Sequence, residues 1–254
     1  MTKFYVTPSQ MREIERRADQ LGVSYYQLME NAGDAAAANI VRIMSEKKLG
    51  GKITMLCGKG NNGGDGYTAA RKLAGAGFSV SCIMLSDEAG TDIAAKELGD
   101  LFAEGLVPVI MLSDGRENVF DTLCDSAVIV DCVFGTGFHG ELPENIAEIL
   151  RYAESCNALK IAMDIPSGGN GQTGLVCEDT LHCDYTVTFG LEKIGTAIYP
   201  LSEYCGEVIV CDIGIPDSCI NSMERLIRRV DIDFVKEHIP VRPKNSHKGT
   251  FGKV

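Results

Sequence analysis

The 254-residue chain has no tryptophan and only four histidines, and none of its ten cysteines forms a Cys-x-x-Cys pair. The histidines do not fall at zinc-binding spacings, which argues against a structural zinc site. The cysteines lie singly inside apolar segments, unlike the cysteine framework of a small secreted protein. We therefore predict core cysteines and a reducing, cytoplasmic compartment.

Two further deficits narrow the choice of partners. The chain has 24 basic against 35 acidic residues and a net charge of −11, whereas binding a nucleic-acid backbone requires a basic face. No apolar run approaches the ~18 residues of a membrane-spanning helix, and the first residues lack the apolar core of a signal peptide. Neither nucleic acid nor membrane is therefore an expected partner.

The chain does have a regular alternation of strand-like and helix-like segments. Thr7-Pro8-Ser9-Gln10 and Ser24-Tyr25-Tyr26-Gln27 match helix-capping patterns and predict two N-terminal helices. The expected helices are 8–20, 25–47, 65–76, 91–104, 115–124 and 143–156, and the expected strands are 52–57, 79–85, 107–112, 127–132, 159–164, 184–189 and 206–212. Since strand and helix alternate and several strands are apolar throughout, we predict one α/β domain with a mostly parallel sheet covered on both faces.

The most informative segment is the loop Gly58-Lys59-Gly60-Asn61-Asn62-Gly63-Gly64-Asp65-Gly66, which follows an apolar strand. Its five glycines let a ligand approach the backbone, and the helix expected to follow favours an anion at its N-terminus. A Walker loop is excluded because Lys59 precedes the asparagines, and a Gly-x-Gly-x-x-Gly match through Gly58, Gly60 and Gly63 is weak evidence. The loop indicates a nucleotide-like ligand, and a mobile glycine-rich turn is the alternative.

Carboxylates end two more of the expected strands. Asp131 precedes the turn 134–137, and Asp164 precedes a Pro-Ser-Gly turn. An unpaired carboxylate in an apolar setting is costly, and the carboxyl ends of parallel strands meet at one edge of a sheet. We therefore expect a shared site there, although each aspartate alone could simply cap a turn.

Six motifs resemble, in order, the signatures of the YjeF N-terminal domain family, the NAD(P)HX epimerases. They are Leu28-Met29-Glu30-Asn31-Ala32-Gly33, the glycine loop, Asp131 with Phe134-Gly135-Thr136-Gly137, Asp164-Ile165-Pro166-Ser167-Gly168, Phe189-Gly190-Leu191-Glu192-Lys193 and Asp212-Ile213-Gly214-Ile215-Pro216. The resemblance covers about residues 5–235. It implies a Rossmann-like three-layer α/β/α sandwich that interconverts the R and S epimers of NADHX and NADPHX, the hydrated forms of the nicotinamide cofactors.

The resemblance also implies residue roles. Substrate contacts are expected from Asn61, Asn62, Gly63, Gly64, Asp65, Gly135, Thr136, Gly137, Phe138, His139, Gly140, Glu141 and Asp164. A potassium ion is expected on Asn62, Asp131 and Ser167, whose oxygens suit a hard cation. The alternative is a hydrogen-bonded network among the same side chains.

Epimerisation sets what the catalytic groups must do. The C6 carbon carries a hydroxyl beside the ring nitrogen, and its configuration is lost if the ring opens or hydroxide departs. Either route needs a group that gives and takes a proton near that hydroxyl. We expect Asp164 in this role, assisted by Asp65 or Lys193, although Lys193 could equally be a surface lysine. The sequence Gly168-Gly169-Asn170 departs from the family pattern and puts any contact from residue 169 in doubt.

Two other functions remain open at this point. A non-catalytic nucleotide-binding or scaffold domain of the same fold would not need the ligand-loop residues, which are all present here. An NAD(P)-dependent dehydrogenase predicts an acidic ribose-binding residue after the next strand. Ser86-Asp87-Glu88 could supply it, but the Asn-Asn-Gly-Gly-Asp core does not suit the dinucleotide fingerprint.

The last residues have a different character. Residues 239–254 are polar and punctuated by prolines, as a linker would be. They are similar to the opening of the ADP- or ATP-dependent dehydratase domain of bifunctional family members. We therefore expect an epimerase domain over 1–238, a linker with a truncated dehydratase start over 239–254, and possible homodimerisation.

Overall fold

A seven-stranded sheet forms the centre of the protein, which a computed structural model describes over residues 4–239 and 243–251. The strand order is β4-β3-β2-β5-β6-β7-β9, and every neighbouring pair is parallel. The strands are β2 (Lys52–Cys57), β3 (Val80–Met84), β4 (Val109–Met111), β5 (Ser126–Cys132), β6 (Leu159–Met163), β7 (Tyr185–Phe189) and β9 (Glu207–Cys211). The predicted strands are confirmed to within one or two residues at each end.

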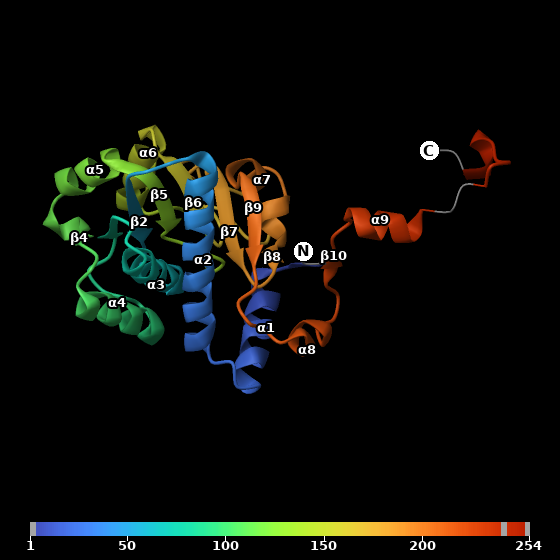
Figure 1. The fold of residues 1–254 in the computed structure, drawn as a ribbon, viewed down its shortest axis with the longest axis horizontal. Coiled ribbons are helices and arrows are strands. Elements are labelled where there is room, and N and C mark those ends of the chain that lie inside the picture. Colours follow the sequence, from blue (N-terminus) through green and yellow to red (C-terminus); the bar gives the residue numbers. More distant parts are fainter. Residues whose placement is uncertain (1–3, 240–242, 252–254) are drawn as a thin grey trace.

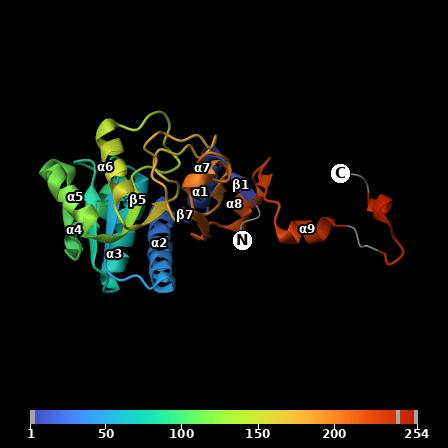
Figure 2. The ribbon, with the colours of Figure 1, turned by 90° about the horizontal axis from the view of Figure 1, so that it is seen from above.

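Helices cover both faces of the sheet (Figures 1 and 2). They are α1 (Pro8–Gln20), α2 (Tyr25–Lys47), α3 (Asn61–Gly75), α4 (Asp92–Glu104), α5 (Arg116–Cys124) and α6 (Glu144–Ser155). One hydrophobic core packs helices α1, α2, α3 and α4 against one face of the sheet. A second core packs α5 and α6 against the other face. The Rossmann-like three-layer sandwich is confirmed.

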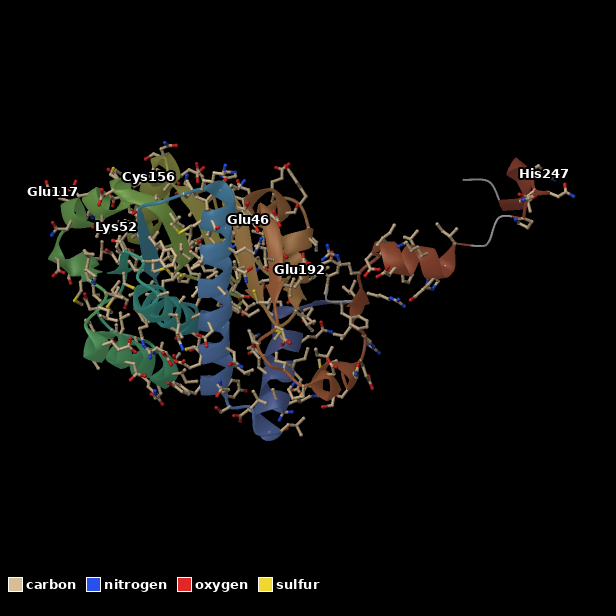
Figure 3. All side chains as sticks on the ribbon, viewed as in Figure 1. Glu46, Lys52, Glu117, Cys156, Glu192 and His247 are labelled. Atoms are coloured by element: carbon tan, nitrogen blue, oxygen red, sulfur yellow. The ribbon has the colours of Figure 1, made fainter. Side chains whose placement is uncertain are left out.

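Short elements complete the chain. They are α7 (Leu201–Tyr204), α8 (Asp217–Asn221), α9 (Ile232–His238) and the 3-10 turns η1 (Leu112–Asp114), η2 (Ile194–Ala197) and η3 (Lys248–Phe251). In Figures 1 and 3, α9 and the segment with His247 stand apart from the sandwich. The predicted linker falls partly on residues 240–242 and 252–254, which lie outside the described residues.

The predicted helix caps and core cysteines are confirmed. The Thr7 hydroxyl accepts a hydrogen bond from the backbone amide of Gln10, and the side chain of Gln10 accepts one from the backbone amide of Thr7. The Ser24 hydroxyl caps α2 by accepting from the backbone amide of Gln27. All ten cysteines are free, and only Cys124 and Cys177 are not buried. None of the described helices has the length and apolar character needed to cross a membrane.

Two features differ from the expectation. The third helix begins at Asn61 and not at residue 65, so the asparagines and glycines of the loop form its first turn. A second, three-stranded sheet was not predicted: β1 (Phe4–Val6) lies between β10 (Ile227–Arg228) and β8 (Glu192–Lys193). Strands of two or three residues are too short to show an alternating pattern.

Candidate active site

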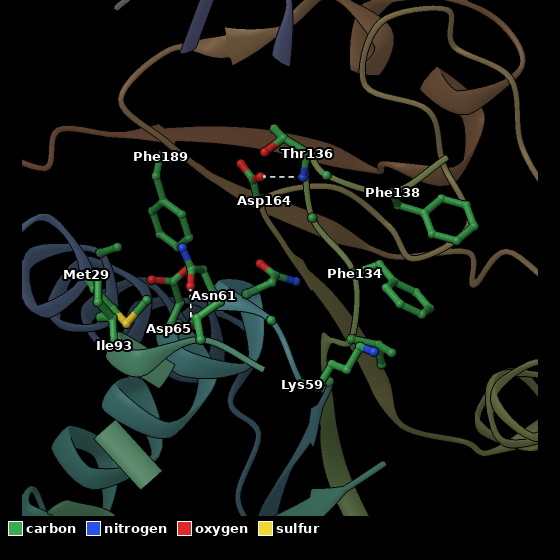
Figure 4. Close-up of a pocket in the computed structure, with 18 of the residues that line it drawn as sticks. Met29, Lys59, Asn61, Asp65, Ile93, Phe134, Thr136, Phe138, Asp164 and Phe189 are labelled. Atoms are coloured by element: carbon green, nitrogen blue, oxygen red, sulfur yellow. Dashed lines mark hydrogen bonds between the residues drawn. The ribbon is translucent and has the colours of Figure 1, made fainter. Parts of the chain in front are cut away.

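The carboxyl ends of β2, β5 and β6 open into a cavity of about 850 Å³, a size typical of small-molecule sites. Its wall is completed by α1, α2 and the residues around β7 and β8. Figure 4 shows the polar groups Asn61, Asp65 and Asp164 between two apolar sides. Met29, Ile93 and Phe189 lie on one side and Phe134 and Phe138 on the other, where the two rings are 4.9 Å apart between centroids.

Close backbone packing explains the glycines at the start of α3. A Cβ at Gly63 would lie 1.9 Å from the Gly58 carbonyl oxygen, and one at Gly58 would lie 2.1 Å from the Val133 carbonyl oxygen. Only glycine permits these approaches. They hold the first turn of α3 against the end of β5. Gly60, the N-cap, offers no side chain to bond the first amides of the helix, which leaves those N–H groups for a ligand.

Asp164 is held by contacts from three sides. Its Oδ2 accepts a hydrogen bond from the Thr136 amide at 3.1 Å, and its Oδ1 accepts one from the Thr188 hydroxyl at 3.1 Å. The Lys193 Nζ lies 2.5 Å from Oδ1, and it also donates to Thr188 and to the Phe189 carbonyl. Asp164 has a φ of +66°, a strained conformation for a non-glycine residue that is often associated with function.

Lys193 is therefore not a surface lysine. Its side chain is 2% exposed, and it lines the cavity. A buried ammonium needs a paired charge and hydrogen bonds, and Asp164, Thr188 and the Phe189 carbonyl supply them.

Asp131 and Ser167 form a buried network beside the cavity. Asp131 accepts hydrogen bonds from the Ser167 amide at 2.7 Å, the Ser167 hydroxyl at 2.5 Å and the Val133 amide at 3.1 Å. Ser167 in turn accepts from the Phe134 amide at 2.8 Å. Burial raises the pKa of Asp131, and the bonds from Ser167 and Val133 oppose that effect. The two residues match the network alternative, while Asn62 is not part of it.

Asn62 is buried without a partner. Neither amide atom of its side chain has a hydrogen-bond partner within the described residues, although Asn62 lines the cavity. A Cβ at Gly135 would lie 3.3 Å from Asn62 Oδ1 and 3.1 Å from Asp164 Oδ2. Unsatisfied buried polar groups are rare and call for a ligand, ion or water.

Two carboxyls in the cavity are perturbed. Burial raises the pKa of Asp65 well above its usual range, and the Asp164 and Glu15 carboxylates raise it further. Burial also raises the pKa of Glu15 to about 7, and Lys193 opposes that effect. Clustering of such groups in a cleft is typical of a functional site.

Most of the predicted substrate-binding residues line the cavity. They are Asn61, Asn62, Asp65, Gly135, Thr136, Gly137, Phe138, His139, Glu141 and Asp164. Gly63, Gly64 and Gly140 do not: Gly63 packs on Gly58 and Gly64 on Met29. The proposed ion ligands Asp131 and Ser167 lie behind the wall and contact its turn 133–136.

The sequence did not reveal several residues of the cavity. Among them are Arg12, Glu15, Tyr25 and Ile93. Those on α1 could not be distinguished from the solvent-facing polar residues of an amphipathic helix. Met29 and Phe189 belong to two of the family motifs but had no predicted role in the site.

Comparisons with known proteins point to one family. Residues 25–195 match the family model described as YjeF-related protein N-terminus. The chain is 34% identical over 250 residues to a bifunctional NAD(P)H-hydrate repair enzyme of Archaeoglobus fulgidus, covering 98% of this chain and 48% of the relative. It is 31% identical over 221 residues to an NAD(P)H-hydrate epimerase of Elusimicrobium minutum, covering 86% of this chain and 99% of the relative.

The fold has a match among solved structures. The crystal structure of yeast ynu0, YNL200c, superposes with a TM-score of 0.70 over 82% of this chain and 87% of the yeast chain, at 23% identity. At that identity the match supports the fold. The present chain spans about half the length of the bifunctional relatives that it matches.

Proposed function

Because the chain belongs to the YjeF N-terminal family, whose model matches residues 25–195, we propose that it is an isomerase that interconverts the R and S epimers of NADHX and NADPHX. The observation that carries the proposal is the buried Asp164–Lys193 pair in the wall of the cavity, next to the first turn of α3. A full-length relative of comparable length is named as an NAD(P)H-hydrate epimerase.

The cavity offers separate surfaces to the parts of such a substrate. The uncapped amides of α3 suit the pyrophosphate, and the apolar walls with Met29, Phe134 and Phe189 suit the rings. A scaffold domain would not require a buried lysine–carboxylate pair in a cavity of this size. A dehydrogenase is not favoured, because Ser86 alone of Ser86-Asp87-Glu88 lines the cavity.

Asp164 is the group proposed to exchange a proton with the C6 hydroxyl. Its Oδ1 is occupied by Lys193 and Thr188, whereas Oδ2 accepts a single hydrogen bond, from the Thr136 amide. Oδ2 therefore has an acceptor site free for a substrate hydroxyl. Lys193 holds the carboxylate in place and balances its charge.

Asp65 assists in a different way. Burial and the neighbouring carboxylates raise the pKa of Asp65, which favours the neutral carboxyl, the form that can donate a hydrogen bond to the substrate. Its carboxyl makes no hydrogen bond within the described residues and lines the cavity.

The proposal includes a potassium ion beside these residues. Asn62 has a buried amide oxygen without a partner, and the buried Asp131 carboxylate lacks a cationic neighbour among the described residues. We infer that Asn62, Asp131 and Ser167 would hold the ion, which would supply positive charge and fix the turn 133–136 against α3. The alternative, a hydrogen-bonded network among the described side chains, does not include Asn62.

Chiral separation of NADHX epimers tests the function. The purified chain, in potassium buffer and without nucleotide or oxidant, is expected to speed equilibration of R- and S-NADHX. Equilibration no faster than in a protein-free control contradicts the proposal and favours a scaffold. The nucleotide-dependent dehydratase step of bifunctional family members is not expected of this chain.

A further inference from the structure

A carboxylate on α1 faces the cavity without an assigned role. Glu15 lines the cavity together with Asp65, Asp164 and Lys193. It is half-buried, and within the described residues its carboxyl makes no hydrogen bond or ion pair. Glu13, two residues away and therefore on another face of the same helix, is instead bonded to Arg16 and Arg17 outside the cavity.

The second sheet brings α1 to Lys193, the partner of Asp164. In that sheet Val6 is the register partner of Lys193, and α1 begins two residues later. A Cβ at Gly171 would lie 3.3 Å from Pro8 Cγ and 3.8 Å from Lys193 Cβ, so the first turn of α1 and Lys193 pack on the same residue.

The next turns of α1 continue toward the cavity. Met11 packs on Gly190, where a Cβ would lie 2.6 Å from the Met11 Cε. Residues four apart lie on one face of a helix, so Glu15 follows Met11 on the face that packs beside β7. The packing of Pro8 and Met11 therefore fixes the part of α1 from which Glu15 projects.

The surroundings of Glu15 suit a group that exchanges protons. Burial raises its pKa to about 7, while Lys193 lowers it and Asp164 raises it, and an acid/base catalyst works best with a pKa near the working pH. The charged or titratable groups that interact with it are Arg12, Tyr25, Asp65, Asp164 and Lys193. With a pKa of about 7, Glu15 would be partly ionised at neutral pH.

An independent observation indicates that the cavity lined by Glu15 is built for a ligand. Asn62 is 8% exposed and lines the same cavity, and both of its amide atoms lack partners within the described residues. The carboxylates are therefore not just a solvated acidic cluster.

We propose that Glu15 is a second catalytic acid/base of this site, exchanging a proton with the C6 hydroxyl from the α1 wall while Asp164 does so from the end of β6. The proposal rests on the epimerase function proposed above. The R and S epimers carry the hydroxyl on opposite faces of the ring. A single fixed group can serve both faces only if the ring turns, whereas groups on two walls can serve one face each.

Protons and electrons balance in an epimerisation that uses both carboxyl groups. Protonated Glu15 gives its proton to the hydroxyl oxygen, the C6–O bond breaks and water leaves with the bonding electrons. The lone pair of the ring nitrogen forms the N=C6 double bond. Water then adds to the other face of C6, the N=C6 π electrons return to the nitrogen, and Asp164 accepts the proton that the water loses. The reverse reaction starts from the resulting state, with Asp164 protonated and Glu15 ionised.

Kinetics of Glu15→Gln test the proposal. The variant keeps the size of the side chain but cannot exchange a proton. Its kcat is expected to fall by ~100-fold or more from either epimer, with little change in KM. The wild-type rate should fall above about pH 7, where the proton shared by the two groups is lost, and this alkaline limb should be absent in Glu15→Gln. Glu15→Asp, which restores a carboxyl on a shorter stem, should recover part of the rate.

Glu13→Gln is the matched control, because Glu13 lies on the same helix outside the cavity, and it should keep the wild-type rate and pH profile. A kcat of Glu15→Gln within about threefold of wild type, a defect confined to KM, or an unchanged alkaline limb would overturn the role of Glu15. An inactive wild type would instead overturn the epimerase function and this proposal together.

Discussion

Replacing Asp164 by asparagine separates the stabilising and catalytic roles of the Asp164–Lys193 pair. Asparagine keeps the size of the side chain and tolerates the positive φ of this position. The substitution removes the negative charge next to an ammonium that is 2% exposed, leaving it with the Thr188 hydroxyl and the Phe189 carbonyl. Breaking a buried pair from one side costs about 3–5 kcal/mol, so we expect Asp164→Asn to lower the free energy of unfolding by about that amount.

A double-mutant cycle shows whether the loss comes from the stranded charge. Lys193→Met removes the ammonium, so in the double variant with Asp164→Asn no buried charge is left uncompensated. The double variant should then be more stable than the sum of the single effects by about 2–3 kcal/mol. Urea unfolding followed by circular dichroism measures each term. As an exposed control, Glu148→Gln breaks the surface pair with Arg116 and should cost no more than about 1 kcal/mol.

Activity of the same variant addresses the catalytic role. At a temperature where Asp164→Asn remains folded, its kcat should be ~100-fold or more below wild type with little change in KM, as expected for a lost acid/base. Additive effects in the cycle would refute the buried pair as the source of the stability. Near-normal turnover would refute the assignment of Asp164 to proton transfer.

Two further predictions concern the ion site and Glu15. Asp131→Asn should act mainly by weakening substrate binding and raising the potassium requirement, and high potassium should restore part of the activity. Initial rates across a KCl series measure this effect. A variant that is inactive although it binds substrate normally would contradict the prediction. Glu15→Gln should raise the free energy of unfolding at alkaline pH. The Glu15 carboxyl has a pKa near 4.5 in the unfolded chain and about 7 in the folded one. The stability that its protonated form provides is therefore present below pH 4.5 and is lost as the pH rises through 7. The gain should be near zero at pH 4 and reach at most about 3 kcal/mol at pH 8, and a gain independent of pH in urea unfolding would show that burial does not perturb this group.

The sheet and the edge at which the cavity opens could be predicted because their signals are local. Strands buried on both faces appear in the sequence as continuous apolar runs, as in residues 127–130. The ends of β2, β5 and β6 are each followed by a turn that contains glycine or proline. Parallel pairing then brings the loop after β2, Asp131 and Asp164 to one edge without any knowledge of long-range contacts.

The start of α3 shows where local signals fail. Asparagine and glycine are poor helix formers, so the sequence favours a loop through residue 64. In the structure the backbone of Gly63 packs on Gly58, and Gly58 packs on Val133. These tertiary contacts outweigh the weak propensity and turn the expected loop into the first helical turn.

The burial of Lys193 and the position of Glu15 depend on contacts between residues almost two hundred positions apart. Val6 pairs with Lys193 across a sheet whose strands have only two or three residues, and no periodic pattern marks strands so short. That pairing closes the cavity with α1 and gives Lys193 a position in which, among the described residues, only Asp164, Thr188 and the Phe189 carbonyl contact its ammonium. The glycine loop and the strand-end aspartates thus form the edge at which the cavity opens, while β1, β8 and α1 determine which further charged groups line it.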